Sequence, residues 1–373
     1  MDLIPVSRPS LGEEELASVR TVFDSGWLGL GAQVLEFEQN LQKFLGAKHV
    51  VCTNTGTTAL HLALDVLGIG KGDEVIVPSF TFVATIQAIT ATGATPVFCD
   101  IHADDLNMDA GDVRKKITRR TKVILPVHYR GIPCDMDAIH ALVKERNITV
   151  VEDAAHAFGS SYKGKKIGSF RNIACFSFDP IKNITCGEGG AVVFQDDALL
   201  EKVQQKRILG IDKDTWSRYR NERSWFYDVV TQGYRYHMSN INAAIGLVQL
   251  GKFEKMNRRK IEVAKQYDAA FENVENVTLL KNDGYREIGL FVYILRIKSR
   301  RNELMDFLGK QGVASGIHYI PSHVFSFYRK EGIHLPVTEQ IYGEILTLPL
   351  FPDITDSQVN QVIDTVTAGM SGR

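Results

Sequence analysis

Residues 148–156 read Ile-Thr-Val-Val-Glu-Asp-Ala-Ala-His, an apolar run that ends in two carboxylates and a histidine. Similar short β-branched runs lie on both sides of it, separated by helical patterns such as 57–67 and 136–145. Their near-continuous apolar character indicates strands that are covered on both faces. Strand–helix alternation of this kind predicts an α/β fold with a mostly parallel central sheet covered by helices. The expected strands are 49–53, 74–78, 95–100, 122–127, 148–153, 173–178 and 191–194.

The C-terminal third has a different pattern. Residues 240–272 are typical of long helices, and 290–297 read as a strand of a smaller α+β part. A chain of 373 residues is long enough for two domains without disulfides or metals. We therefore predict a large domain over residues 1–250 and a small one over 251–373, although no Pro- or Gly-rich linker marks the boundary.

Charge and cysteine content argue against several classes of protein. The 43 basic and 44 acidic side chains give a net charge of −1, without the basic footprint of a nucleic-acid binder. The five cysteines have neither zinc spacing nor a disulfide pattern, so we expect no metal and reduced thiols. The start lacks signal-peptide features, and no stretch is long and apolar enough for a bilayer. These features predict a cytoplasmic protein with neither nucleic acid nor membrane as a partner.

Chemistry is expected where the parallel strands end, because ligands of open α/β sheets bind beyond the carboxyl ends of the strands. Residues 53–59, Thr-Asn-Thr-Gly-Thr-Thr-Ala, stand between a strand and a helix. The free N–H groups and the dipole of a helix start favour an anion such as a phosphate, and Gly56 permits close approach. The alternative, an ordinary helix N-cap, is common for Ser and Thr.

A second candidate is Asp153 with His156. A carboxylate that faces a heterocyclic nitrogen keeps the nitrogen protonated, which a pyridoxal ring needs if it is to accept electrons. The competing interpretation is that Asp153 caps a helix starting at Ala154 and that His156 is merely packed or exposed. Phe82 also follows a strand end and could stack on a cofactor ring, although core packing is the favoured explanation when this segment is judged alone.

The third candidate is Lys182, within residues 175–190, Cys-Phe-Ser-Phe-Asp-Pro-Ile-Lys-Asn-Ile-Thr-Cys-Gly-Glu-Gly-Gly. Apolar surroundings disfavour the ammonium form, and a neutral amine is what forms a Schiff base. The glycines would allow the backbone to pass close to a bound ring. The alternative is a lysine in a surface turn, which is the common fate of lysine. Residues 163–166, Lys-Gly-Lys-Lys, fit that alternative and read as a hairpin.

Taken together, the order of these features resembles the fold-type I enzymes that depend on pyridoxal 5'-phosphate (PLP). More narrowly, the chain is similar to the aminotransferases that act on nucleotide-linked keto sugars, the DegT/StrS type. The resemblance covers nearly the whole chain, and its most specific motifs are residues 152–156 and 176–190. Further matches are residues 7–9, 127–136, 243–246, 317–323 and 348–350.

The resemblance implies a role for each matching residue. Lys182 would carry the cofactor and move the proton, Asp153 would pair with the ring nitrogen, and His156 would lie near the phenolic oxygen. Phe82 would stack on the ring. The remaining implied ligands are Gly56, Thr57, Thr58 and Ser177 for the phosphate, Arg235 and His237 of a neighbouring subunit for the same phosphate, and His318 and Tyr319 for the sugar nucleotide.

Other positions are less well defined. The charged, aromatic stretch 214–227 either contacts the nucleotide through residues such as Arg218 and Trp225 or forms a mobile surface loop. Asp179 stands where the family commonly has histidine, and Arg130 replaces a residue that is usually uncharged. Arg235 and His237 stand where the family often has Asn and then Arg. One branch of the family has histidine in place of the lysine and performs dehydration, and Lys182 argues against that branch.

The implied function is transfer of an amino group from L-glutamate to a nucleotide-linked 4-keto or 3-keto deoxysugar. The products would be amino sugars for a surface polysaccharide or a secondary metabolite. A homodimer with shared active sites is implied as well. Two alternatives stay open from the residues alone: another fold-type I PLP enzyme acting on a non-nucleotide substrate, and a non-enzymatic regulatory relative.

Overall fold

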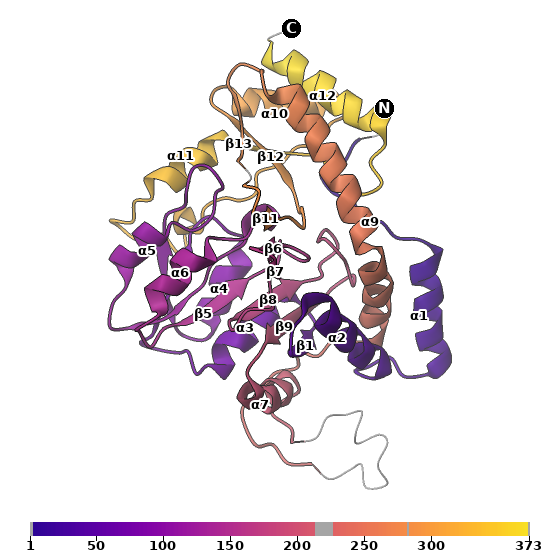
Figure 1. Cartoon of the computed structure of the whole chain (residues 1–373), viewed down its shortest axis with the longest axis vertical. Coiled ribbons are helices and arrows are strands. Elements are labelled where there is room, and N and C mark those ends of the chain that lie inside the picture. The colour runs from indigo at the N-terminus through magenta and orange to yellow at the C-terminus, as the bar shows by residue number, and fades with distance from the viewer. Residues whose placement is uncertain (1–2, 213–226, 282, 372–373) are drawn as a thin grey trace.

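A computed structural model describes residues 3–212, 227–281 and 283–371 (Figure 1). Its centre is a seven-stranded sheet in the order β1-β9-β8-β5-β4-β2-β3. Strand β9 runs antiparallel to both of its neighbours, and the other pairs are parallel. The predicted α/β class is therefore confirmed. The strands are β1 (His49–Thr53), β2 (Glu74–Pro78), β3 (Thr95–Cys99), β4 (Thr121–Ile124), β5 (Thr149–Asp153), β8 (Ile173–Ser177) and β9 (Gly190–Phe194).

The observed strand bounds follow the apolar runs closely. The largest difference is in β4, which ends at Ile124 where the sequence predicts 127. Pro126 has no N–H group and cannot continue the ladder, although its carbonyl still accepts a hydrogen bond from the Asp153 N–H at 2.9 Å. The expected lysine hairpin is also present, as the antiparallel strands β6 (Ser161–Tyr162) and β7 (Lys165–Lys166).

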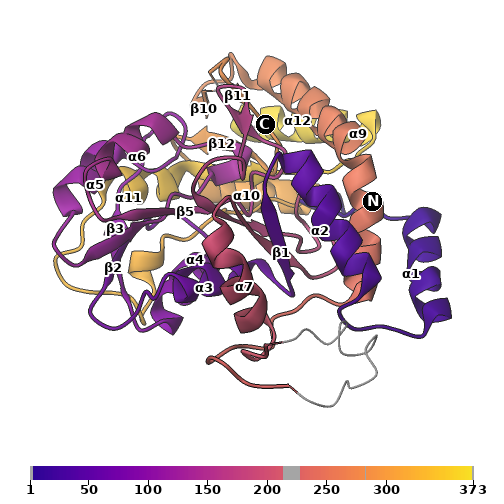
Figure 2. The same cartoon turned by 60° about the horizontal axis from the view of Figure 1, so that its bottom comes forward.

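Helices cover both faces of the sheet (Figure 2). Alternate residues of each strand enter opposite cores: Val50 and Cys52 belong to one buried cluster, and Val51 to the other. This alternation explains why the strands are apolar along their whole length. One face is covered by α2 (Ala32–Leu45), α5 (Ala110–Lys116), α6 (Met136–Val143) and the first part of α9 (Asn240–Phe271); the other is covered by α3 (Gly56–Val66), α4 (Val83–Ala91) and α7 (Asp197–Arg207).

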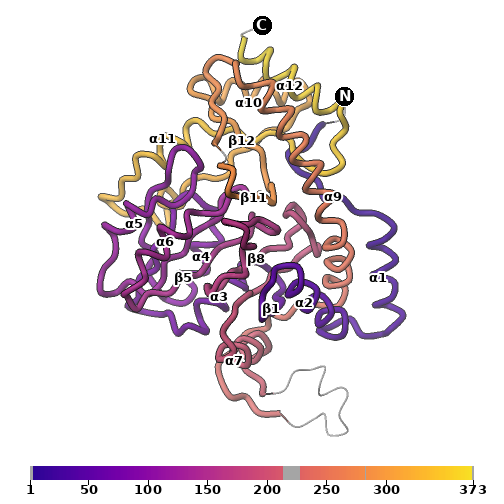
Figure 3. Tube along the Cα trace, in the orientation of Figure 1, coloured from indigo at the N-terminus to yellow at the C-terminus, as the bar shows by residue number. Residues whose placement is uncertain are grey.

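A smaller three-stranded antiparallel sheet, in the order β10-β12-β13, packs with the C-terminal helices around its own buried cluster. Figure 3 shows α9 running from the central sheet to this second part, beside α1 (Glu13–Ser25). The predicted boundary at residue 250 falls inside α9, so no linker exists there, and the division into two domains stays a prediction. The further elements are β10 (Val277–Leu279), β11 (Arg286–Glu287), β12 (Tyr293–Ile297), α10 (Arg301–Lys310), α11 (Pro336–Glu344), β13 (Ile345–Leu348) and α12 (Asp356–Met370).

Among the described residues, no helix combines the length and apolarity that crossing a bilayer requires.

Candidate active site

A cavity of about 350 Å³ lies at the carboxyl ends of β1, β5 and β8, where the topology of the sheet predicts a ligand site. Side chains from well-separated parts of the sequence share its wall. The lining includes Thr55, Gly56, Thr57, Phe82, Thr85, Asp153, His156, Ser177, Asp179, Lys182, Glu188, His318 and Tyr319.

Lys182 enters this cavity from the turn that follows β8. The turn is closed by a hydrogen bond from the Lys182 N–H to the Asp179 carbonyl at 3.1 Å, with Pro180 inside it. The Lys182 ammonium nitrogen lies 4.3 Å from the centre of the Phe291 ring. Burial lowers the pKa of Lys182 to about 8, although the carboxylates of Asp179 and Asp153 act in the opposite direction. A substantial fraction of the amine is therefore neutral near physiological pH, as a nucleophile requires.

Asp153 ends β5 and is buried, with 4% of its surface exposed. Its Oδ2 accepts a hydrogen bond from the Thr85 hydroxyl at 2.7 Å, and its Oδ1 accepts one from the Ala155 N–H at 3.0 Å. Burial raises the pKa of Asp153, and both hydrogen bonds oppose that rise. Turns, and no helix, follow at residues 154–160, so the helix-cap interpretation of Asp153 is wrong.

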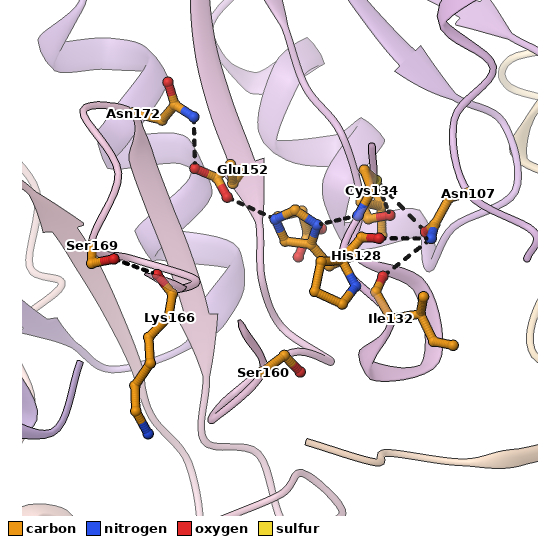
Figure 4. Close-up of polar contacts among 12 residues, drawn as sticks. Asn107, His128, Ile132, Cys134, Glu152, Ser160, Lys166, Ser169 and Asn172 are labelled. Atoms are coloured by element: carbon orange, nitrogen blue, oxygen red, sulfur yellow. Dashed lines mark hydrogen bonds and ion pairs between the residues drawn. The ribbon is translucent and has the colours of Figure 1, made fainter. Parts of the chain in front are cut away.

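Glu152 points away from Asp153, because successive side chains of a strand face opposite sides of the sheet. It is fully buried and lies between His128 and Asn172 (Figure 4). His128 Nδ1 accepts from the Cys134 N–H at 3.0 Å, so the neutral ring donates from Nε2 to Glu152 Oε2 at 2.7 Å. The Asn172 amide donates to the other oxygen at 2.9 Å. This network holds the end of β5 from the side of the sheet opposite to Asp153.

His156 has one ring nitrogen bonded within the protein and one without a partner among the described residues. Nε2 lies 3.0 Å from the Tyr319 hydroxyl, and Nδ1 is buried without a hydrogen bond. The ring stacks on Phe291 at 4.2 Å between centroids. Burial, the nearby Lys182 and His318 all lower the pKa of His156, so its imidazole is neutral. A neutral ring with an unused nitrogen suits contact with a ligand group.

The start of α3 also lines the cavity. Thr55 is the N-cap of the helix, and its hydroxyl accepts from the Thr58 N–H at 3.1 Å. The Thr58 hydroxyl donates to Asn54 Oδ1 at 2.8 Å, and Thr58 does not line the cavity. A Cβ at Gly56 would stand 2.7 Å from the Cβ of Ser177, so only glycine fits there. The segment therefore combines the two interpretations: Thr55 caps the helix, and Gly56 and Thr57 at the helix start still line the cavity.

The residues that the family resemblance assigns to the substrate come from segments outside the sheets. His318 and Tyr319 line the cavity and are half-buried, and His318 Nδ1 lies 2.9 Å from the Thr347 hydroxyl. Burial lowers the pKa of His318 to about 4. His323 lies outside the cavity, with its Nδ1 2.7 Å from the Ser79 hydroxyl. Arg218 and Trp225 lie outside the described residues.

Arg235 and His237 do not line the cavity of their own chain. Both belong to a separate pocket of about 340 Å³, together with residues 27–30 and Ile208. Sequence reasoning also missed two residues of the site: Thr85, which donates to Asp153 and stands only three residues after Phe82, and Phe291, which contacts both Lys182 and His156. Their only signal was a position near a strand or helix end.

The residues of the cavity fit PLP. A buried carboxylate, an amine of lowered pKa, a histidine with an unused nitrogen and a helix N-terminus are arranged around one space, with Phe82 at its side. Fold and cavity together define the class as a fold-type I PLP enzyme.

Comparison with known proteins identifies the family. Residues 9–367 match the model of the DegT/DnrJ/EryC1/StrS aminotransferase family, and the chain belongs to that family. It is 40% identical over 372 residues to the uncharacterized protein MJ1066 of Methanocaldococcus jannaschii, covering 97% of this chain and 96% of that protein.

Solved structures agree with this identification. The putative sugar aminotransferase Spr1654 of Streptococcus pneumoniae, in its pyridoxamine phosphate (PMP) form, superposes with a TM-score of 0.94 at 33% identity, over 99% of each chain. PseC of Helicobacter pylori, an aminotransferase involved in the biosynthesis of pseudoaminic acid, gives 0.93 at 29% identity over both whole chains. Spr1654 was also solved with PLP. The family and these neighbours are PLP-dependent sugar aminotransferases, and this chain is a PLP-dependent aminotransferase of the same family.

Proposed function

We propose that the protein transfers the amino group of L-glutamate to a nucleotide-linked keto deoxysugar in the cytoplasm. The product would enter an amino sugar of a surface polysaccharide or a secondary metabolite. The observation that carries this proposal is the cavity itself, which joins the cofactor residues to the polar pair His318 and Tyr319. The names of the neighbours support it, since Spr1654 is described as a sugar aminotransferase and PseC serves pseudoaminic acid biosynthesis.

Each residue of the cofactor end has a task that its surroundings support. PLP, when bound, supplies the electron sink that stabilises a carbanion at the substrate carbon. Asp153 holds the proton of the ring nitrogen, and Thr85 and the Ala155 N–H keep the carboxylate in place. The lowered pKa of Lys182 would let its amine take the α-proton of the amino donor and return it to a carbon of the cofactor. His156, oriented by Tyr319, would face the phenolic oxygen.

The other end of the cavity would receive the sugar. His318 is neutral over the physiological range because burial lowers its pKa to about 4, so its ring donates or accepts hydrogen bonds without adding charge. The Tyr319 hydroxyl already contacts His156, and sugar hydroxyls could extend this chain of hydrogen bonds. Glutamate and keto sugar would use the same cavity in turn, with the amino group held between the two half-reactions.

The cofactor phosphate would be bound by two subunits. Gly56, Thr57 and Ser177 line the phosphate end within one chain. The same chain's Arg235 and His237 lie in a different pocket, which supports a role toward the cavity of a second copy. We therefore propose a homodimer in which each copy supplies these two hydrogen-bond donors, of which Arg235 is cationic, to its partner.

A panel of nucleotide-linked keto sugars with L-glutamate tests the substrate proposal. We expect glutamate-dependent gain of one amino group by mass spectrometry, with 4-keto isomers ahead of 3-keto isomers, and product NMR places the nitrogen. Amination of a free keto acid or an unmodified keto sugar, with no nucleotide sugar accepted, would refute the sugar-nucleotide proposal and leave the PLP chemistry standing.

A further inference from the structure

A second buried lysine lies close to Lys182 but has no part in the chemistry described above. Lys260 is in the middle of α9, with only 4% of its surface exposed. Its ammonium nitrogen donates one hydrogen bond, to Asn183 Oδ1 at 3.1 Å, and it has no carboxylate partner within the described parts of the chain. Burial lowers the pKa of Lys260 to about 7. Lysine is rarely buried without an acidic partner, so the position calls for an explanation.

Asn183, the only hydrogen-bond partner of the Lys260 side chain among the described residues, is the next residue after Lys182. Its amide nitrogen donates to the carbonyls of Gly289 at 2.8 Å and Phe158 at 3.1 Å, and it lies 3.4 Å from the carbonyl of His156. Because the NH₂ group faces three carbonyls, the oxygen of the amide must point to Lys260. Asn183 thereby joins the turn of Lys182 to two other chain segments, and Lys260 completes its hydrogen bonding.

These segments leave almost no free space. A Cβ at Gly289 would be 2.0 Å from the carbonyl oxygen of Phe158, and one at Gly131 would be 2.1 Å from that of Gly289. Two residues beyond Gly289, the Phe291 ring stacks on His156 and contacts the Lys182 amine. A change at Asn183 would therefore move the surroundings of Lys182 as well.

Lys182 and Lys260 also line the same narrow cleft. The volume of this cleft is only about 20 Å³, enough for roughly one water molecule. No carboxylate lines this cleft, whose polar wall otherwise consists of serine, threonine, amide and arginine side chains.

We propose that Lys260, acting through Asn183, is a positioning residue that holds the Lys182 turn against Phe291 and thereby sets the reactivity of the Lys182 amine. This inference rests on the assignment of Lys182 as the cofactor lysine. Its test uses the amine in cofactor-free protein, so it can fail while the proposed function stands.

The test measures the rate at which an amine-modifying reagent labels Lys182 across pH 6–11 in the full chain freed of cofactor, with the label mapped by mass spectrometry. In Lys260→Met, we expect the Lys182 turn to loosen and the amine to reach water, so that its titration midpoint rises by about one unit. The labelling rate at pH 8 should then fall roughly fivefold, because a higher pKa leaves less neutral amine. Lys255→Met removes an exposed lysine of the same helix and should leave the profile unchanged.

A double variant separates positioning from the mere loss of a neighbouring charge. In the Asn183→Ala background, Lys260→Met should add no further shift to the Lys182 profile, because the connecting amide is already gone. If Lys260→Met shifted the Lys182 midpoint in the Asn183→Ala background as much as it does alone, the charge of Lys260 would act directly on Lys182, and the proposal would be overturned. An unchanged profile in the single Lys260→Met variant would overturn it as well. If Lys260→Met does not fold, the single variant Asn183→Ala provides the test. It should raise the titration midpoint of Lys182, and an unchanged midpoint would refute the role of Asn183.

Discussion

The two ends of the cavity are built differently. At the cofactor end, Asp153 is the last residue of β5 and Lys182 lies in the turn after β8, and hydrogen bonds from Thr85 and Ala155 hold the carboxylate. At the acceptor end, His318 and Tyr319 belong to a segment without regular structure and are half-buried. In the proposed function, the central sheet would position the residues of the chemistry, whereas connecting segments, which tolerate change, would recognise the substrate.

The largest effect is expected from Lys182→Ala, because in the proposed function this amine carries the cofactor and moves the proton. We expect a loss of about 10⁴-fold or more in turnover, near the upper range for removal of a general base. In the parent protein, borohydride should fix the cofactor to Lys182, as mapped by peptide mass, and in the variant it should fix none. Lys165→Ala, in the exposed hairpin, should behave as the parent. A mass tag on any other lysine of the parent would rule out the assignment.

Asp153→Ala should fold and retain some cofactor, yet lose transamination by about 10³-fold. The ring nitrogen would lose the partner of its proton, and the electron sink would weaken. Rates of both half-reactions, followed by the change in the cofactor absorbance, measure the loss.

The neighbouring carboxylate provides the control for that change. Glu152→Gln should cost about 1–3 kcal/mol of stability, because the added NH₂ group faces the donors of His128 or Asn172. The turnover of its folded fraction should stay close to that of the parent. Near-normal turnover of Asp153→Ala would show that Asp153 has only a structural role.

The same contrast explains how much of the molecule was readable from the sequence. Strand ends and their chemical residues were predictable because an apolar run, a turn and a reactive side chain are contiguous. Contacts across the sheet were not: Thr85 and Asp153 are 68 residues apart, and Lys260 and Asn183 are 77 apart. A single threonine or lysine in a helix has no local pattern that indicates such a partner. Thr58 is a further example, since its position suggested a phosphate ligand and its hydroxyl closes the helix cap.

Arg235→Ala tests whether the cofactor end is completed by a second copy. We expect weaker cofactor binding, by roughly tenfold, from loss of one charge-assisted contact to phosphate. The mixing test is run at a cofactor concentration too low to load Arg235→Ala homodimers, so that these and the Lys182→Ala homodimers are both inactive alone. Heterodimers of the two chains should then have one intact site, and activity should return to the mixture. Heterodimers that form, as seen by tagged co-purification, but stay inactive would contradict the sharing of Arg235.

At the acceptor end, an effect confined to one substrate is expected from His318→Ala. The His318 ring is held by the Thr347 hydroxyl at 2.9 Å and is neutral at assay pH, so the change removes hydrogen-bonding capacity and not charge. A lost hydrogen bond of about 1.4 kcal/mol corresponds to a tenfold rise in the KM for the keto sugar. The glutamate half-reaction should change less than twofold, because the donor does not need this contact, and no new pH dependence should emerge between pH 6 and 8. His334→Ala, which removes an exposed histidine outside the cavity, is the matched control. If His318→Ala slowed both half-reactions equally, His318 would belong to the cofactor end, and the division between a rigid chemical end and an adaptable substrate end would not hold.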